Sequence, residues 1–244
     1  RLFLNMITLN LTHGCKLLEK YNKYMKQNPF YEVNEYGSYK SKNFLNPIEV
    51  YNDDYWSIKH NRSTIDEQVA NVIEKNKYVK RDIYKDGNKK ILEIACSPGI
   101  LIGELSDSFE CHGIEIDERY KQKIKTYSKL AELYFGFFPQ ITQDWKENTF
   151  SNIIALDVFE HIEDGHGFLK ECKRLLCNNG RLIIQAPIIM EDEIMPDTMF
   201  LPSEHIWIYN HKHFKKMLID VKLLLIKTER IFPGHEHWVI ENKI

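Results

Sequence analysis

The sequence predicts an α/β fold whose sheet is mostly parallel and has an antiparallel C-terminal edge. Short apolar runs, typical of buried strands, alternate with amphipathic segments, typical of helices. Four small or turn-forming residues, 96–99, connect the first of these strands directly to a helix. The last two expected strands, 221–231 and 237–241, are joined only by a short Pro-Gly turn, which favours antiparallel pairing.

The remaining elements are placed by the spacing of their apolar residues. Gly180 follows the expected helix 167–177 closely, as the glycine of a C-terminal helix cap does. Pro187 ends the next strand, and residues 188–208 are expected to form a long loop of the kind usually tied to function. The expected parallel strands are 91–95, 111–117, 133–138, 149–157 and 181–186, and the expected helices between and after them include 118–129, 167–177 and 211–219.

Composition narrows the class of protein and its partners. Of the 244 residues, 28% are charged and 43% are hydrophobic, which is ordinary for a soluble globular protein. A net charge of −2 with both signs interspersed gives no general attraction to nucleic acid or to an anionic membrane. Five cysteines without the spacing of a disulfide framework predict reduced thiols in a cytoplasmic protein. The apolar runs are too short to span a membrane, and the N-terminus lacks the pattern of a signal peptide.

We expect two parts in the chain, a helical and aromatic N-terminal cover segment, 1–88, and the α/β domain, 89–244. The first part lacks the alternation of strands and helices that marks the second. It contains an expected helix at 15–26 and another that begins at residue 63 and ends near Lys80. Apolar spacing predicts that Ile73 lies on the buried face of the second helix.

Aromatic residues are concentrated between these two helices, in the segment 28–56. A segment so aromatic is expected to be ordered. It either packs as a plain cover on the main domain or takes part in substrate binding, and Tyr55 and Trp56 are its candidate substrate contacts. We expect residues 28–60 and 188–208 together to cover the pocket of the substrate, because both segments lie outside the regular alternation.

The strand and turn that begin the α/β domain predict a ligand site. At the turn, Ala95 to Gly99, a backbone with small side chains can approach a ligand, and the N–H groups of the following helix point toward it. The next strand ends with Glu115, whose carboxylate can accept hydrogen bonds from both hydroxyls of a ribose. This pair favours a nucleoside over a phosphate as the ligand.

Three stretches resemble the class I S-adenosylmethionine-dependent methyltransferases. Glu93-Ile94-Ala95-Cys96-Ser97-Pro98-Gly99 resembles their first motif, E/D-x-G-x-G-x-G, with Ala95 and Ser97 in place of two glycines. Residues 150–162 resemble the pattern F-D-x-I-x-x-x-D-V-L-E-H-I, except for Ser151 and Phe159. Residues 168–184 resemble F-L-x-E-x-x-R-L-L-x-x-G-G-x-L-I-I. The resemblance covers about residues 89–190, whereas the dinucleotide pattern G-x-G-x-x-G has no match here.

The resemblance implies a Rossmann-like methyltransferase sheet and S-adenosylmethionine as the cofactor. Phe137 and Phe138 follow the third strand, where the fold lines the adenine, and each either stacks on the adenine or packs in the core. The chain has no N/D-P-P-Y/W motif and no basic patch with aromatic residues, which favours a small-molecule methyl acceptor over nucleic acid. The candidate cofactor-binding residues are Glu93, Ala95, Cys96, Ser97, Gly99, Glu115, Ile116, Phe137, Phe138, Asp157 and Val158.

Transfer to a hydroxyl group benefits from a general base, most often histidine. His205 and His161 are the candidate catalytic bases, and Glu160 and Glu204 are candidate substrate contacts that could orient them. Alternatively, Glu160 and His161 cap the turn after the fourth strand and bond only to backbone. The pair His211 and His213 begins a helix, where we expect both side chains to be solvated or to cap the helix.

Two groups of residues have side chains that could bind a metal ion. His235, Glu236 and His237 alternate along an expected strand, so that both imidazoles could converge on one ion, but the sequence offers no third ligand beside them. The carboxylates of Asp157, Glu160 and Asp164 could hold a magnesium ion, as in some sugar O-methyltransferases. We assign no metal to the protein from its sequence.

These observations favour transfer of a methyl group to a hydroxyl of a small molecule. By analogy the acceptor is a sugar, a nucleotide-linked compound or a capsular polysaccharide precursor, including one with a phosphoramidate group. N-methylation is an alternative, and so is a binding or regulatory protein without turnover, which Ala95 and Ser97 favour. A nicotinamide-dependent oxidoreductase is disfavoured by the missing dinucleotide pattern. The oligomeric state is left open.

Overall fold

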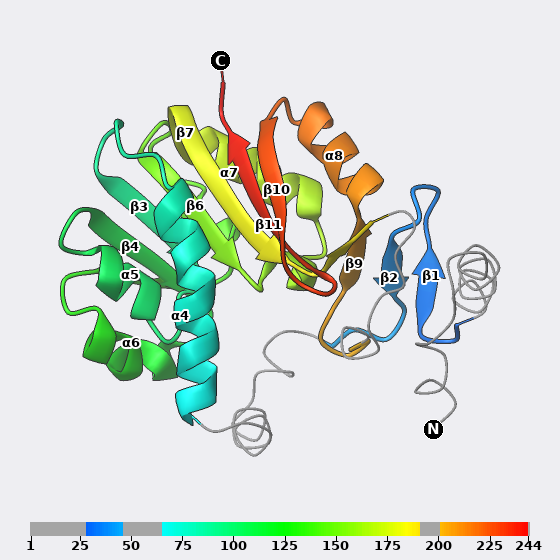
Figure 1. The fold of residues 1–244 in the computed structure, drawn as a ribbon, viewed down its shortest axis with the longest axis horizontal. Helices are drawn as coiled ribbons and strands as arrows, with labels where there is room; N and C mark the ends of the chain where they lie inside the picture. The colour runs from blue at the N-terminus through cyan, green and yellow to red at the C-terminus, as the bar shows by residue number, and fades with distance from the viewer. Residues whose placement is uncertain (1–27, 46–64, 191–200, 244) are drawn as a thin grey trace.

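The computed structural model describes residues 28–45, 65–190 and 201–243 and shows a twisted sheet covered by helices (Figure 1). The expected helix at 15–26 and the residues Tyr55 and Trp56 lie outside the described residues. Within the described part of the chain, no helix combines the length and the apolar character needed to cross a membrane.

The main sheet has seven strands in the order β10-β11-β7-β6-β3-β4-β5. The strands from β7 to β5 are parallel, whereas β11 pairs antiparallel with both β7 and β10. The predicted fold class, a mostly parallel sheet with an antiparallel C-terminal edge, is therefore confirmed. These strands are β3 (Lys90–Ile94), β4 (Glu110–Glu115), β5 (Glu132–Phe135), β6 (Phe150–Leu156), β7 (Leu176–Ala186), β10 (Leu224–Phe232) and β11 (His235–Glu241).

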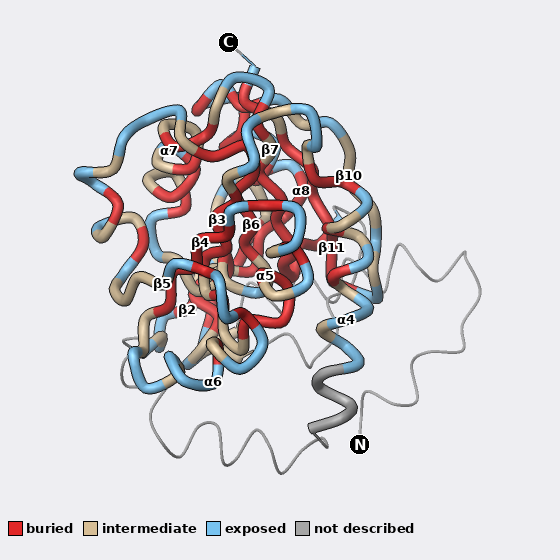
Figure 2. Tube along the Cα trace, turned by 90° about the vertical axis from the view of Figure 1, so that its left-hand side faces the viewer, coloured by how far each residue is buried: buried red, intermediate tan, exposed pale blue. Residues whose placement is uncertain are grey.

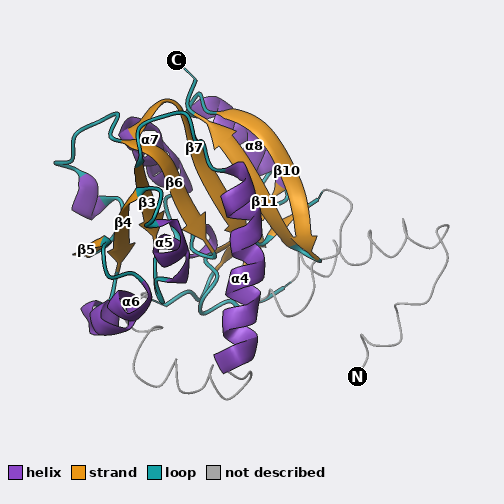
Figure 3. Ribbon diagram, turned by 60° about the vertical axis from the view of Figure 1, so that its left-hand side comes forward, coloured by secondary structure: helices purple, strands orange, loops and turns teal. Residues whose placement is uncertain are grey.

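Helices cover both faces of this sheet (Figure 3). On one face lie α4 (Ile65–Asp82), α5 (Ile100–Leu105) and α6 (Lys121–Tyr127), and on the other lie α7 (Gly165–Leu175) and α8 (His211–Asp220). Short 3-10 helices follow three of the strands, namely η1 (Glu118–Tyr120), η2 (Gln140–Thr142) and η3 (Phe159–His161).

The core forms two layers because successive residues of a strand point to opposite faces. Ile91 packs with the layer beneath α4 and α5, whereas its neighbour Leu92 packs with the layer beneath α7. Ile154 and Ile153 divide between the same two layers. The central strands are buried along their length, as Figure 2 shows. A sheet buried on both faces explains why its strands appear in the sequence as continuous apolar runs.

A second, four-stranded sheet joins the two segments that were expected to form a cover. Its order is β1 (Tyr31–Val33), β2 (Tyr39–Ser41), β9 (Trp207–Asn210) and β8 (Ile188–Ile189). The expectation that 188–208 is all loop was therefore wrong at both ends of that segment. The β1–β2 hairpin has no counterpart in the predicted elements, because its two strands are too short to show an alternating pattern.

Two local predictions were also wrong. Gly180 does not cap a helix, because α7 ends at Leu175 and β7 begins at the next residue. Instead, Asn179 N–H donates to the carbonyl of Asn242 at 2.7 Å, and Asn242 N–H donates to the carbonyl of Gly180 at 2.9 Å. Pairing with the C-terminal segment thus replaces the cap. The second wrong prediction concerns α4, where the side chain of Ile73 is 39% exposed and not buried. The helix packs on the sheet through residues nearer its C-terminus.

Candidate cofactor and acceptor site

A cavity opens at the carboxyl ends of β3 and β6. The space between its lining residues, with the open solvent at its mouth included, is about 430 Å³. The turn after β3 forms its floor, α4 contributes one wall, and the end of β6 contributes another. It is lined by Val72, Lys75, Asn76, Glu93, Ala95, Cys96, Ser97, Pro98, Gly99, Ile100, Leu101, Leu156 and Asp157.

The turn adopts a backbone conformation that suits small residues. Both Ala95 (φ 59°) and Gly99 (φ 92°) lie in the left-handed region. A Cβ at Gly99 would come within 2.8 Å of the backbone oxygen of Ile124, so this position needs glycine. Cys96 is buried against Gly113 of β4, where a Cβ would lie 2.6 Å from the Cys96 Sγ. The backbone can therefore approach a ligand here, although Ala95 bears some strain.

Glu115 holds the turn from the neighbouring strand. Its Oε2 accepts a hydrogen bond from Ser97 N–H at 3.1 Å, and its Oε1 accepts one from Ile116 N–H at 2.8 Å. The side chain is buried at the end of β4, and desolvation raises the pKa of its carboxyl. Glu115 and Ile116 thus lie beside the turn, and the binding of the ribose hydroxyls by Glu115 stays a prediction.

Glu93 is a second buried carboxylate and lines the cavity itself. Its Oε2 has no hydrogen-bond partner among the described residues. Desolvation by burial raises the pKa of Glu93 to about 8. A buried carboxyl group with an unsatisfied oxygen is a suitable partner for a cationic group of a ligand, which would supply the missing interaction.

Asp157, at the end of β6, is bound from two sides. Lys75 of α4 donates to its Oδ2, and His235 Nε2 lies 2.8 Å from its Oδ1. Desolvation acts to raise the pKa of Asp157, but the Lys75 and His235 contacts outweigh it and hold the pKa below its usual range. Sequence patterns did not indicate Lys75, because it comes from a helix outside the recognised motifs.

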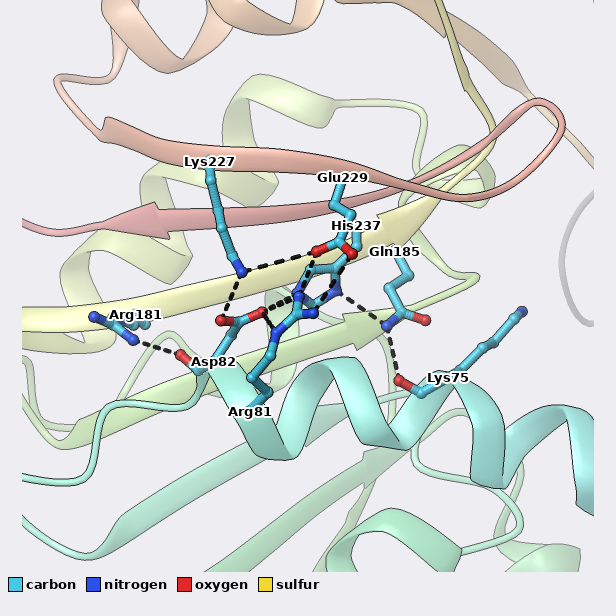
Figure 4. A network of polar contacts seen from close by, with 8 residues as sticks. All are labelled: Lys75, Arg81, Asp82, Arg181, Gln185, Lys227, Glu229 and His237. Carbon is cyan, nitrogen blue, oxygen red and sulfur yellow. Dashed lines mark hydrogen bonds and ion pairs between the residues drawn. The ribbon is translucent and has the colours of Figure 1, made fainter.

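A buried polar network fixes α4, and hence Lys75, to the sheet (Figure 4). Gln185 Nε2 donates to the carbonyl of Lys75 at 3.1 Å and lies 3.1 Å from His237 Nδ1. His237 Nε2 in turn lies 3.1 Å from Asp82 Oδ2, at the end of α4. Asp82 also binds Lys227 of β10 at 2.8 Å. The network therefore ties one wall of the cavity to β7, β10 and β11.

A second group of functional side chains lies beyond the end of β6. Glu160 and His161 belong to η3, and His205 lies just before β9. One ligand atom from each of these residues lies within 4.8 Å of the others, and the two imidazole rings are 5.0 Å apart at 73°. His161 Nδ1 is 2.8 Å from the carbonyl oxygen of Glu204. The structure thus brings together both candidate bases and Glu160, whereas Glu204 contributes its backbone carbonyl.

The other predicted site residues lie outside the cavity lining. Phe138 is buried and packs edge to face against Phe168 at 5.0 Å, while Phe137 is 41% exposed. Val158 is half-buried and packs against the core beneath α7.

The prediction for His211 and His213 was wrong, since both are buried. His213 stacks on Tyr36 at 5.1 Å and hydrogen-bonds with Ser38 Oγ at 2.9 Å, so it joins α8 to the β1–β2 hairpin. His211 packs on Trp238 at 4.8 Å. The suggested pairing of His235 and His237 on one ion is also absent from the described residues, because each imidazole binds a different aspartate.

A family model described as a methyltransferase domain matches residues 59–223, which is more than half of the chain. The chain belongs to this methyltransferase family. The match includes α4, the cofactor turn, η3 and His205.

Individual relatives agree with this assignment at the level of the fold. The methyltransferase is 27% identical over 122 residues to the ubiquinone biosynthesis O-methyltransferase of Pelagibacter ubique; the match covers 44% of this chain and spans about half, 50%, of that protein. One similar structure comes from the complex between the Haloferax volcanii Trm112 methyltransferase activator and a methyltransferase. The matched chain of that complex has a TM-score of 0.61 at 12% identity, and the match covers 70% of this chain and 90% of that one. An S-adenosylmethionine-dependent methyltransferase from Mesorhizobium loti has a TM-score of 0.56 at 9% identity, covering 67% and 95%.

S-adenosylmethionine is accordingly the cofactor of the methyltransferase, and the cavity fits it. The cofactor has two cationic groups, its sulfonium and its ammonium, a carboxylate, and a ribose with two hydroxyls. The cavity has an unsatisfied carboxyl oxygen on Glu93, a lysine ammonium on Lys75, and Glu115 beside the turn. Ionised Glu93 is opposite in charge to the ammonium, Lys75 is opposite in charge to the carboxylate, and Glu115 can accept hydrogen bonds from the ribose hydroxyls.

Proposed function

We propose that the methyltransferase transfers a methyl group from S-adenosylmethionine to a hydroxyl group of a small molecule. The observation that carries this proposal is the convergence of Glu160, His161 and His205, because Glu160 comes three residues after Asp157, which lines the cofactor cavity. Imidazole is the side chain best suited to accept a hydroxyl proton near neutral pH. S-adenosylmethionine supplies the methyl group as an activated sulfonium.

The residues of the chain mainly hold and align the reactants. Glu115 binds the ribose hydroxyls, Glu93 faces the ammonium group, and the backbone of the turn 95–99 lies against the nucleoside. In the transfer, the acceptor oxygen forms a bond to the methyl carbon, the carbon–sulfur bond breaks, and S-adenosylhomocysteine leaves as a neutral sulfide. Alignment of an attacking atom with its target contributes most of the rate in such displacements.

The hydroxyl proton passes to an imidazole of the second group. The carbonyl of Glu204 can only accept a hydrogen bond, so Nδ1 of His161 carries its proton and Nε2 has the basic lone pair. Glu160 Oε1 lies 3.9 Å from this Nε2 and stabilises the imidazolium that forms. His205, whose ring lies 5.0 Å away, is the second candidate.

For the acceptor we propose a sugar, a nucleotide-linked compound or a capsular polysaccharide precursor, including a phosphoramidate group. The second sheet supports a ring-shaped acceptor, because Trp207 of β9 is half-buried there with Lys40 Nζ 5.6 Å from its ring. Aromatic faces commonly pack against rings, and a nearby lysine favours an anionic group.

The test is to incubate the methyltransferase with S-adenosylmethionine and a panel of such acceptors and to measure S-adenosylhomocysteine and the methylated product. His161→Asn and His205→Asn should be compared with His166→Asn, whose side chain is 43% exposed near Asp220. Removal of the true base should lower kcat by ~10²–10⁴-fold and leave binding of S-adenosylhomocysteine nearly unchanged. A loss below about tenfold in both variants would mean that alignment, without a protein base, drives the transfer.

A binding protein without turnover is the second candidate, because the left-handed Ala95 stands where the family motif has glycine. Such a protein would bind the cofactor in calorimetry yet release no S-adenosylhomocysteine with any acceptor. If amine acceptors added to the same panel were methylated while hydroxyl acceptors were not, the result would instead establish N-methylation.

A further inference from the structure

The group of Glu160, His161 and His205 has a composition that general acid–base chemistry does not require. Two imidazoles and one carboxylate converge so that a ligand atom of each lies within 4.8 Å of the others. Glu160 is 2% exposed and His205 is 8% exposed. A single base would use one imidazole and its carboxylate partner, which leaves the second imidazole without a role, whereas two imidazoles and a carboxylate are a common set of metal ligands.

A hydrogen bond to the backbone fixes the ring of His161 in the way that is usual for metal-binding histidines. Its Nδ1 donates to the backbone carbonyl of Glu204, which leaves Nε2 as the coordinating atom. Metal-binding histidines usually donate their other ring N–H to a carbonyl or carboxylate in this way, since the bond fixes both the tautomer and the ring. The backbone of His205 is held in the same short segment, because its backbone N–H donates to the carbonyl of Leu201 at 2.7 Å.

We propose that Glu160, His161 and His205 bind one divalent transition-metal ion such as Zn²⁺ or Mn²⁺. Two nitrogen ligands favour these ions over Mg²⁺ and Ca²⁺, which prefer oxygen. Metal–ligand bonds of about 2.1 Å hold ligand atoms roughly 3–3.5 Å apart. Ion binding should therefore shorten the distances between the three ligand atoms by about 1 Å. Glu160 Oε1 and His161 Nε2 are at present 3.9 Å apart.

Three protein ligands leave coordination positions open, and the acceptor hydroxyl would take one of them. In the metal-bound protein the ion replaces the imidazoles as the group that activates the acceptor, because it lowers the pKa of a bound hydroxyl, whose proton then passes to solvent. Its oxygen then attacks the methyl carbon as the carbon–sulfur bond breaks. This role rests on the proposed hydroxyl transfer, whereas ion binding itself does not.

The first experiment measures ion binding without acceptor or cofactor. Chelator-treated methyltransferase is titrated with Zn²⁺ by calorimetry and with Co²⁺ by absorption spectroscopy. We expect one ion per chain, and at least tenfold weaker binding in Glu160→Gln and in His205→Asn, with His166→Asn equal to the wild type. Because a variant could fold poorly, Tm is measured with and without Zn²⁺, and the ion should raise Tm of the wild type more than that of either variant. Failure of the wild type to bind an ion stoichiometrically, or equal binding in all variants, overturns the proposal.

The second experiment separates the metal site from the proposed function. Chelation should abolish methyl transfer, Mn²⁺ or Zn²⁺ should restore it, and binding of S-adenosylhomocysteine should be unchanged throughout. Transfer that persists fully in metal-free enzyme overturns the metal's role and leaves the histidines as bases. An ion that binds in the first experiment to a protein that methylates no hydroxyl would retain the metal site and contradict the proposed function.

Discussion

Three acidic residues lie in or beside the cofactor cavity, on β3, at the end of β4 and directly after β6, and each has a different environment. Glu115 accepts two backbone N–H groups, and Asp157 is bound by Lys75 and His235. Glu93 is buried, and one of its carboxyl oxygens has no hydrogen-bond partner among the described residues. Because burial raises its pKa to about 8, most molecules carry a protonated Glu93 at neutral pH. A cationic ligand would favour its ionised form.

Glu93→Gln should therefore stabilise the protein and weaken the binding of its ligand. The pKa of Glu93 is raised from 4.5 to about 8 on folding, so its contribution to the free energy of unfolding is greatest below pH 4.5 and falls as the pH rises toward 8. Glutamine resembles the protonated carboxyl group and does not titrate. We expect Glu93→Gln to be more stable at pH 7, by at least about 1 kcal/mol, and equal at pH 4. Urea unfolding at the two pH values measures the difference, and equal stability at both would contradict the raised pKa.

The same residue predicts a pH dependence for ligand binding. A ligand ammonium that pairs with Glu93 must displace its proton, so affinity for S-adenosylhomocysteine should increase as the pH rises from 6 to 8 and level off above that value. Calorimetry across this range measures the trend, and in Glu93→Gln it should be absent. A trend of the same size in both proteins would assign the titration to another group.

At the scale of elements, α4 forms a wall of the cavity because a buried network holds its C-terminal half against the sheet (Figure 4). His237 is fully buried at the centre of this network, between Gln185 and Asp82. Desolvation lowers the pKa of His237, so the imidazole is neutral and acts through hydrogen bonds. None of these partners is near another in the sequence, and the network was therefore not predictable from motifs.

His237→Ala should loosen α4 and with it the cavity. Loss of a buried group that bonds to two partners should cost about 2–4 kcal/mol of the free energy of unfolding. Affinity for S-adenosylhomocysteine should also fall, because Lys75 is carried by the same helix. The matched control, His166→Ala on the surface, should change stability by no more than about 0.5 kcal/mol. Lost stability with unchanged affinity would show that α4 does not position the site.

At the scale of the whole molecule, the sequence predicted those parts of the fold and of the site whose residues follow one another closely in the chain. The turn 95–99 and the end of β4 could be placed because strand, turn and acidic residue follow one another in a fixed pattern. His161 and His205 could be named individually, but their convergence depends on β9 pairing with β2 and β8. His211 and His213 were misjudged because helix position alone does not show that Trp238 and Tyr36 cover them.

The second sheet joins the N-terminal segment to β9, beside the residues proposed to meet the acceptor, and Ser38 contributes to this connection. Ser38 Oγ accepts from Asn210 N–H at 2.8 Å and hydrogen-bonds with His213. Ser38→Ala leaves this N–H without its partner, at a local cost of about 1–2 kcal/mol. We expect KM for the acceptor to rise by up to about tenfold while affinity for S-adenosylhomocysteine is retained. Steady-state kinetics beside the control Ser106→Ala measures this effect; an equal change in cofactor affinity would argue against a separate acceptor side.

The most direct test of the cofactor site is a calorimetric titration of S-adenosylhomocysteine into the wild type and into Glu115→Ala. One molecule should bind per chain, and the substitution should weaken binding by at least ~1.5 kcal/mol, about tenfold, because a charge-assisted contact to the ribose hydroxyls is lost. Far-ultraviolet circular dichroism confirms that the variant is folded. Equal affinity in the two proteins would contradict the placement of the nucleoside between the turn 95–99 and the end of β4.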